Sequence, residues 1–233
     1  MNLPKAFGSE YEVKETRREG SFQGYRLPQE LKLLRRRLLA ALCTGYLRRD
    51  QQQGRVLNSI RRRAYNDEGR FQSLFEYASM VAELVDMDVV NVPTMDWAQA
   101  AATTVRMAQR ITNRSVVLVS EIIDPQKLAV MKNYAESVIK FETVKATAAG
   151  TLDLEDLKAK LNDDVIGVYF ENPNYLGVIE PNGQAVSDAV HAAGGLSLVG
   201  VDPISLGVLS TPPTYGADIV CGDLQPLGIH MYY

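Results

Sequence analysis

The sequence predicts an α/β fold in three layers, in which helices cover both faces of a mostly parallel sheet. From residue 67 onward, amphipathic segments of helical length alternate with short apolar segments of about six residues, the usual length of a strand. The short segments are rich in β-branched residues and apolar on both of their faces. Strands of that kind belong to parallel sheets, because the connecting helices cover both sides.

The alternation begins with two helices. Residues 71–87, FQSLFEYASMVAELVDM, have apolar side chains at the three- and four-residue steps of one helix face. Residues 96–112, DWAQAAATTVRMAQRIT, form the second helix, and their alanine content predicts that this helix is buried. On the first helix we expect the following side chains to point inward: Phe71, Leu74, Phe75, Ala78, Val81, Ala82 and Val85.

Strands and further helices then follow in turn. The helices are predicted at residues 124–137, 153–162 and 182–194. We expect Asp153 to cap the second of these helices and Gly194 to end the third. The strands are predicted at residues 115–120, 138–144, 164–172, 196–202 and 217–222.

Residues 1–66 differ in character from the rest, and we expect a basic helical N-terminal arm there and an α/β body at residues 67–233. The arm carries 15 Lys and Arg against 6 Asp and Glu, whereas the body carries 10 against 22. Such an asymmetry suits nucleic acid, an anionic surface or a complementary protein face. No nucleic-acid motif or aromatic interleaving accompanies the arginines, so we expect no nucleic acid. A helix over residues 27–49 has one apolar stripe, formed by Leu31, Leu34, Leu38, Leu42 and Tyr46.

The composition excludes several classes of protein. No apolar run approaches the ~18 residues that cross a bilayer, and no apolar signal segment follows Met1, so we expect neither membrane insertion nor secretion. Cys43 and Cys221 are far apart, which is typical of reduced thiols in a cytoplasmic protein. His191 and His230 are too few for a metal site, and we interpret Cys221 as a core thiol.

Polar residues gather where three of the predicted strands end. The strand in YFENPNYLGVIE ends at Glu171-Asn172-Pro173-Asn174, and the next strand ends at Asp202. The last strand is followed by Gly222-Asp223-Leu224-Gln225-Pro226. Each segment alone is explained by a turn or a bend. Ligands of such a sheet nevertheless bind at the carboxyl ends of its strands, which makes this edge the candidate site.

Together these segments resemble the large domain of fold-type-I pyridoxal phosphate enzymes, which have the aspartate aminotransferase-like fold. Within that superfamily the sequence is similar to the P protein (glycine decarboxylase) of the glycine cleavage system, and most of all to the α chain, subunit 1, of its two-subunit form. The similarity runs from about Phe71 to the C-terminus. The phrases that carry it are LFEYASMVAELVDMDVVN, DWAQAAATTVRMAQRIT, KLAVMKNYAE, LDLEDLKAKL, VYFENPNYLGVIE and GADIVCGDLQPLGI.

The resemblance implies that the Schiff-base lysine, and with it pyridoxal phosphate, belongs to the partner β chain. In this chain Gln225-Pro226 stand where a His-Lys pair would be, and the last lysine of the sequence is Lys160. Asp96 precedes the helix whose N-terminus meets the phosphate in cofactor-binding relatives, and a carboxylate there repels a phosphate dianion. We therefore expect this chain to bind no cofactor and to have no catalytic residue. Its vestigial or cleft-lining residues are expected to be Asn172, Asn174, Asp202 and Gln225.

The function that the resemblance implies is that of a lysine-less α subunit of glycine dehydrogenase (aminomethyl-transferring), an oxidoreductase. The chain is expected to pair with a β subunit in a cytoplasmic heterotetramer. The pyridoxal phosphate of the β subunit decarboxylates glycine, and the aminomethyl group passes to the lipoyl arm of H protein.

Departures from the family leave alternatives open. The segment before the first helix is shortened to RRRAYNDEGRFQSLFEY, a Gly-Ala-Gly-Tyr-like loop is retained only as Gly45-Tyr46, and relatives continue past Tyr233 into a small C-terminal domain. We therefore expect that domain to be missing and the chain to be a fragment, a truncated paralogue or a decayed copy. The alternative function is that of a non-catalytic homologue that acts as a binding or scaffold protein. A free-standing pyridoxal phosphate enzyme would need a lysine such as Lys127 or Lys132, which we expect on a helix outside the carboxyl-end cleft.

Overall fold

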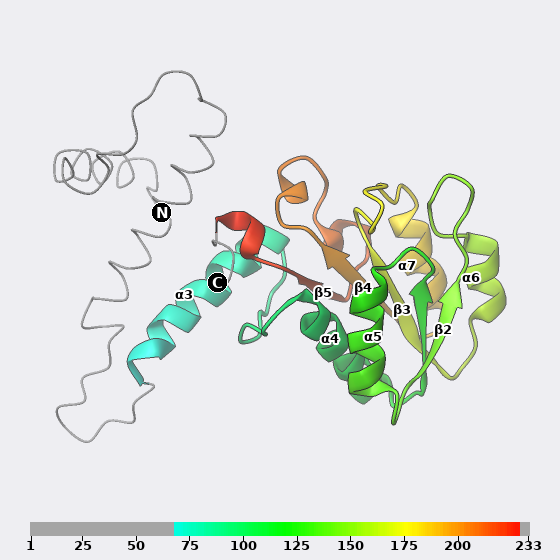
Figure 1. Cartoon of the computed structure of the whole chain (residues 1–233), viewed down its shortest axis with the longest axis horizontal. Helices are drawn as coiled ribbons and strands as arrows, with labels where there is room; N and C mark the ends of the chain where they lie inside the picture. The colour runs from blue at the N-terminus through cyan, green and yellow to red at the C-terminus, as the bar shows by residue number, and fades with distance from the viewer. Residues whose placement is uncertain (1–67, 229–233) are drawn as a thin grey trace. The chain divides into compact units, whose positions relative to one another are not determined.

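The structure, a computed structural model, describes residues 68–228 of the 233-residue chain. Within these residues, five strands form one sheet in the order β2-β1-β3-β4-β5, and every neighbouring pair is parallel (Figure 1). The predicted α/β class is confirmed. The strands are β1 (Val116–Ser120), β2 (Lys140–Val144), β3 (Val165–Glu171), β4 (Leu196–Val201) and β5 (Ile219–Gly222).

Helices cover both faces of this sheet, as predicted. One core joins α4 and α5 to the sheet and includes Val105 and Met131, which are fully buried. A second core joins α6 and α7 to the opposite face and includes Leu157 and Val190. The helices are α3 (Glu68–Val85), α4 (Trp97–Thr112), α5 (Pro125–Ala135), α6 (Leu154–Lys160) and α7 (Gly183–Ala192).

The predicted helix ends are confirmed at two positions. The side chain of Asp153 caps α6, because it accepts hydrogen bonds from the backbone N–H groups of Glu155 and Asp156. Gly194 follows α7 with φ +68°, a left-handed conformation that glycine adopts without strain. These local signals explain why the predicted and observed bounds agree closely.

The prediction that Phe71 and Phe75 point inward is wrong. Their side chains on α3 are 62% and 68% exposed, whereas Val85 on the same helix is buried. An apolar stripe indicates that one face of a helix is suited to being covered. The spacing of the residues does not tell which part of a molecule covers it.

Several predictions fall outside the described residues. They concern the basic arm at residues 1–66 with its apolar stripe, Cys43 and His230. The boundary between arm and body therefore stays a prediction. In the part of the chain that the structure describes, no helix is long and apolar enough to span a membrane.

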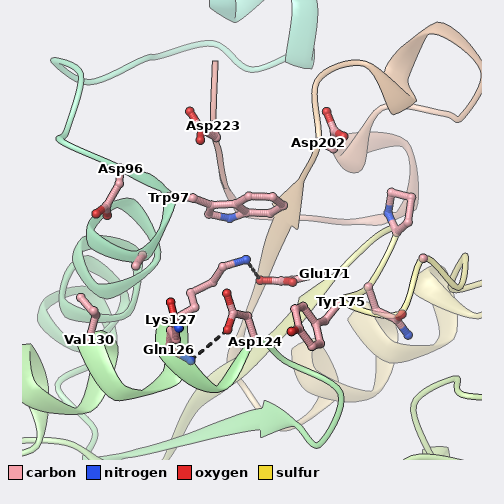
Figure 2. Close-up of a pocket in the computed structure, with 14 residues that line it drawn as sticks. Asp96, Trp97, Asp124, Gln126, Lys127, Val130, Glu171, Tyr175, Asp202 and Asp223 are labelled. Carbon is pink, nitrogen blue, oxygen red and sulfur yellow. Dashed lines mark hydrogen bonds and ion pairs between the residues drawn. The ribbon is translucent and has the colours of Figure 1, made fainter. Parts of the chain in front are cut away.

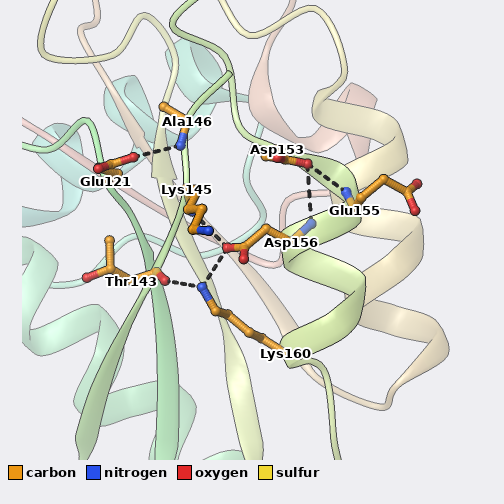
Figure 3. A network of polar contacts seen from close by, with 8 residues as sticks. All are labelled: Glu121, Thr143, Lys145, Ala146, Asp153, Glu155, Asp156 and Lys160. Atoms are coloured by element: carbon orange, nitrogen blue, oxygen red, sulfur yellow. Dashed lines mark hydrogen bonds and ion pairs between the residues drawn. The ribbon is translucent and has the colours of Figure 1, made fainter. Parts of the chain in front are cut away.

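A polar network joins α6 to the edge strand β2 (Figure 3). Asp156 Oδ2 accepts the backbone N–H of Lys145 at 2.9 Å and pairs with Lys160 Nζ at 2.5 Å. Lys160 Nζ also donates to the backbone oxygen of Thr143 at 2.7 Å. The hydrogen bonds from Lys160 and then Lys145 lower the pKa of Asp156 below its ordinary value. The network therefore holds α6 at the edge of the sheet while Asp156 is ionised.

Candidate functional site

The strand order places a ligand crevice between β1 and β3. The chain runs from β1 to β2 on one side and then returns to β3 on the other. Open α/β sheets bind ligands at such a switch point, beyond the carboxyl ends of the strands. A hollow of about 670 Å³ lies at this edge (Figure 2). The lining residues that matter for its chemistry are Asp96, Trp97, Lys127, Glu171, Asp202 and Asp223.

One face of β3 supplies the inner wall of the hollow. Tyr169 and Glu171 are two residues apart, so their side chains leave the same face of the strand. Gly200 of β4 pairs with Glu171, and its lack of a side chain makes room for both groups. A Cβ atom at Gly200 would lie 2.7 Å from Tyr169 Oη, 2.9 Å from Glu171 Cγ and 3.3 Å from Trp97 Cζ2. These side chains therefore meet around a position that only glycine leaves open.

Lys127 and Glu171 form a buried ion pair in this hollow (Figure 2). Lys127 Nζ lies 2.5 Å from Glu171 Oε1 and 3.5 Å from the centroid of the Trp97 ring. Tyr169 donates its hydroxyl to the same Glu171 oxygen at 2.9 Å. Lys127 is 8% and Glu171 4% exposed, so water screens the pair only weakly. Loss of either partner would leave a buried charge without compensation.

Burial keeps the neighbouring tyrosine and cysteine protonated. Burial, followed by the influence of Cys221 and Glu171, raises the pKa of Tyr169 well above its ordinary value. Burial also raises the pKa of the Cys221 thiol to about 11, and its sulfur lies 4.0 Å from Tyr169 Oη. Tyr169 is therefore a hydrogen-bond donor to Glu171. Cys221 is a core thiol, as predicted. Its raised pKa leaves it little thiolate character at neutral pH.

Aspartate side chains cap the N-termini of α4 and α5, the two helices that begin at the hollow. Asp96 caps α4 by accepting the backbone N–H of Gln99 at 2.7 Å. Asp124 caps α5 by accepting the backbone N–H of Gln126 at 2.9 Å. A helix N-terminus binds phosphate through its free N–H groups and its positive dipole. Both termini here already have an anion in place.

The charges of the hollow do not fit a phosphate-bearing cofactor such as pyridoxal phosphate. Asp202 and Asp223 complete a set of five lining carboxylates, against one lysine. A phosphate dianion is repelled by such a lining. The lysine, Lys127, is engaged with Glu171 and is not free to form an imine while that pair is intact.

The structure separates the four predicted cleft residues into two pairs. Asn174 and Asp202 line the hollow, and both accept backbone N–H groups of their own loops. Asn174 also donates to the backbone oxygen of Gly150 in another loop. Asn172 and Gln225 do not line it. Asn172 is buried and accepts the backbone N–H of Glu180, and Gln225 is exposed in the 3-10 turn η3 (Gln225–Leu227). Their role as vestigial residues stays a prediction.

The expectation that Lys127 lies outside the cleft is wrong. In a parallel α/β unit, the helix that follows a strand begins at the carboxyl edge of the sheet, so the first turn of α5 borders the hollow. Lys132 lies about 7.5 Å further along the helix axis. It lines a different hollow, together with Ser115 and Lys140 near the starts of β1 and β2. The sequence contains a signal for this position, because Asp124-Pro125 marks a helix start and so puts Lys127 in the first turn, at the carboxyl edge of the sheet.

The histidine and cysteine of the described part have ordinary structural partners. His191 Nε2 lies 2.7 Å from Asp218 Oδ2, and Cys221 is buried next to Tyr169. Across residues 68–228, no three His, Cys, Asp or Glu side chains are grouped so that they could hold a metal ion.

Known proteins similar to this chain have consistent descriptions. The family model described as "Glycine cleavage system P-protein" matches residues 64–233. "Probable glycine dehydrogenase (decarboxylating) subunit 1" of Aeropyrum pernix is 44% identical over 170 residues, which are 71% of this chain and 37% of the relative. The protein of the same description from Staphylothermus marinus is 40% identical over 169 residues, covering 71% and 36%. The chain thus spans little more than a third of the length of these curated relatives.

Solved structures agree with this result. A glycine decarboxylase (P-protein) of the glycine cleavage system, in inhibitor-bound form, aligns with a TM-score of 0.70 and 31% identity, over 95% of this chain and 55% of that chain. The apo cysteine desulfurase from Thermococcus onnurineus aligns with a TM-score of 0.58 over 79% of this chain and 46% of that chain, and at 16% identity it supports the fold alone. The predicted fold-type-I architecture of pyridoxal phosphate enzymes is thereby confirmed. Since the family model covers residues 64–233, well over half of the sequence, this chain belongs to the glycine cleavage system P-protein family.

Proposed function

We propose that this chain is a subunit-1-like component, without a Schiff-base lysine, of glycine dehydrogenase (aminomethyl-transferring), an oxidoreductase of the glycine cleavage system. It pairs with a second subunit that carries pyridoxal phosphate, decarboxylates glycine and passes the aminomethyl group to the lipoyl arm of H protein. The observation that carries this proposal is the family match over residues 64–233. The curated relatives are described as subunit 1, which supports the existence of a partner chain.

The residues of the hollow support different roles for the two subunits. None of the residues from Asp202 to Tyr233 is a lysine, and Gln225-Pro226 stand after β5. Lys127 is paired with Glu171, and the acidic lining disfavours a phosphate. When bound, pyridoxal phosphate supplies an electron sink for a carbanion, and we assign this chemistry to the second subunit. The role of this chain is to pair with that subunit and complete the walls of its cleft.

A second candidate function is that of a non-catalytic binding or scaffold protein. The observation that favours it is that every charged side chain lining the hollow is bonded within the chain. Groups that are bonded in this way support the fold, which fits a binding or scaffold protein.

Co-expression with the second subunit distinguishes the two functions. Size-exclusion chromatography shows whether the chains form a complex. Exchange of labelled bicarbonate into the carboxyl group of glycine, in the presence of lipoylated H protein, shows whether the complex decarboxylates. We expect a complex whose exchange activity requires both chains. A complex without exchange would support the scaffold role, and the absence of any complex would contradict both.

A further inference from the structure

Lys127 occupies a position that is unfavourable for a lysine. It lies in the first turn of α5, where the positive end of the helix dipole repels a cation. Its side chain is only 9% exposed, and lysines are rarely buried without a partner. The groups around the ammonium therefore hold Lys127 in place, against the preference of the helix.

Those groups have the chemistry that recognises an ammonium ion. The Glu171 carboxylate lies 2.5 Å from the Lys127 nitrogen, and the centroid of the Trp97 ring lies 3.5 Å from it. Figure 2 shows the indole beside the amino group, with Glu171 at the end of the lysine side chain. A carboxylate supplies charge-assisted hydrogen bonds and an indole face supplies a cation–π contact. Tyr169 donates to the same Glu171 oxygen and so fixes the orientation of the carboxylate.

The groups that bind the ammonium and Lys127 itself come from different helices and strands. Trp97 begins α4, and Tyr169 and Glu171 lie at the end of β3, where all three meet around Gly200. Tyr169 is fully buried, which keeps it in one position. Lys127 enters from α5. Removal of its side chain therefore leaves the other groups supported by their own packing.

We propose that Trp97, Tyr169 and Glu171 form a binding site for primary alkylammonium ions, and that the chain fills this site with its own Lys127. The ligand class follows from the geometry. The ligand needs one positive charge for the indole face of Trp97, N–H donors for Glu171, and an unbranched aliphatic chain like that of Lys127. In the native chain the amino group of a substrate is thereby excluded from this part of the hollow. The site depends neither on the second subunit nor on glycine dehydrogenase activity, so the two proposals fail independently.

The test uses the full 233-residue chain with the substitution Lys127→Ala and n-propylammonium as the probe. Propylammonium supplies the carbons and the nitrogen that this substitution removes. Trp97 is the single tryptophan of the sequence, so its emission reports on this site alone. We expect Lys127→Ala to lower Tm, and propylammonium to restore more than half of the loss with a saturable change in Trp97 emission. Propanol has the same shape without the charge and should produce neither effect.

Two control variants make the test specific. Lys127→Met fills the same volume without a charge, so it should not respond to propylammonium. The double variant Lys127→Ala, Glu171→Gln relieves the unpaired buried charge, and it should bind propylammonium about tenfold more weakly, because a hydrogen bond to a neutral acceptor is weaker than one to a carboxylate.

Recovery of folded Lys127→Ala only in the presence of propylammonium would also support the site. The proposal is overturned if folded Lys127→Ala shows no saturable response, or if propanol and propylammonium act alike. It is equally overturned if Lys127→Ala stays unfolded at high propylammonium concentrations while Lys127→Met folds.

Discussion

Replacing Gly200 with alanine places a methyl group where three side chains already meet. The new Cβ atom would lie 2.7 Å from Tyr169 Oη, 2.9 Å from Glu171 Cγ and 3.3 Å from Trp97 Cζ2. Tyr169 is fully buried and Glu171 is held by Lys127, so the two side chains nearest to the new methyl group would have to break existing contacts to move aside. Overpacking of this kind costs about 1–3 kcal/mol. For a chain of this length that corresponds to a fall in Tm of about 2 to 12 °C.

Gly207→Ala is the matched control, because a Cβ atom at Gly207 meets no heavy atom within 4 Å. It should leave Tm unchanged or raise it slightly. Alanine reduces the conformational entropy of the unfolded chain, which stabilises the folded state by about 0.4–1 kcal/mol where the backbone tolerates it. Both variants are measured by thermal unfolding, followed by circular dichroism and by Trp97 emission. Gly200→Ala should also change the emission of the folded state. Equal Tm values for the two variants would refute the proposed packing around Gly200.

Three further predictions concern single side chains. Asp202→Asn should lower the free energy of unfolding by less than about 1 kcal/mol, because an amide oxygen still accepts the Ile204 N–H at 3.0 Å, and the reconstituted complex should keep its exchange activity. Unchanged stability with lost exchange activity would place Asp202 in a working site. In a Cys43→Ser background, iodoacetamide should modify Cys221 slowly at pH 8, because a pKa of about 11 leaves roughly one thiol in a thousand ionised. Alkylation as fast as in the unfolded chain would contradict the burial of Cys221. The pKa of Asp156 is lowered by Lys160, so its stabilising effect is present above the ordinary carboxyl pKa and is lost as pH falls through the lowered value. Asp156→Asn should therefore lower Tm at pH 7, and the difference in Tm should shrink as the pH falls below the ordinary carboxyl pKa. A difference that does not change with pH would show that the ion pair contributes nothing.

The elements of the fold are predictable from the sequence because their signals are local. The segment expected at residues 164–172 forms β3 (Val165–Glu171), and Asp153 and Gly194 mark helix ends as expected. The strand order is not predictable in this way, because pairing joins segments that are distant in the sequence. The exposure of Phe75 has the same cause, since periodicity describes one helix and not its surroundings.

The candidate site is only partly predictable for a related reason. Asn174 and Asp202 follow the ends of strands, and strand ends in a parallel sheet meet at one edge. Glu171 is visible in the sequence at such an end, but its partner is not. Lys127 precedes it by 44 residues and looks like an ordinary helix lysine. Only the three-dimensional structure brings its ammonium to Glu171 and the face of Trp97.

The location of pyridoxal phosphate in the reconstituted complex tests the proposed function most directly. Borohydride reduction fixes the cofactor to the lysine that holds it, and mass spectrometry of the peptides identifies the chain. We predict pyridoxyl-lysine in the second subunit only, and exchange activity only when both chains are present. Pyridoxyl-lysine in this chain, at Lys127 or at any other lysine, would contradict the claim that this member of the P-protein family supports the reaction without holding the cofactor.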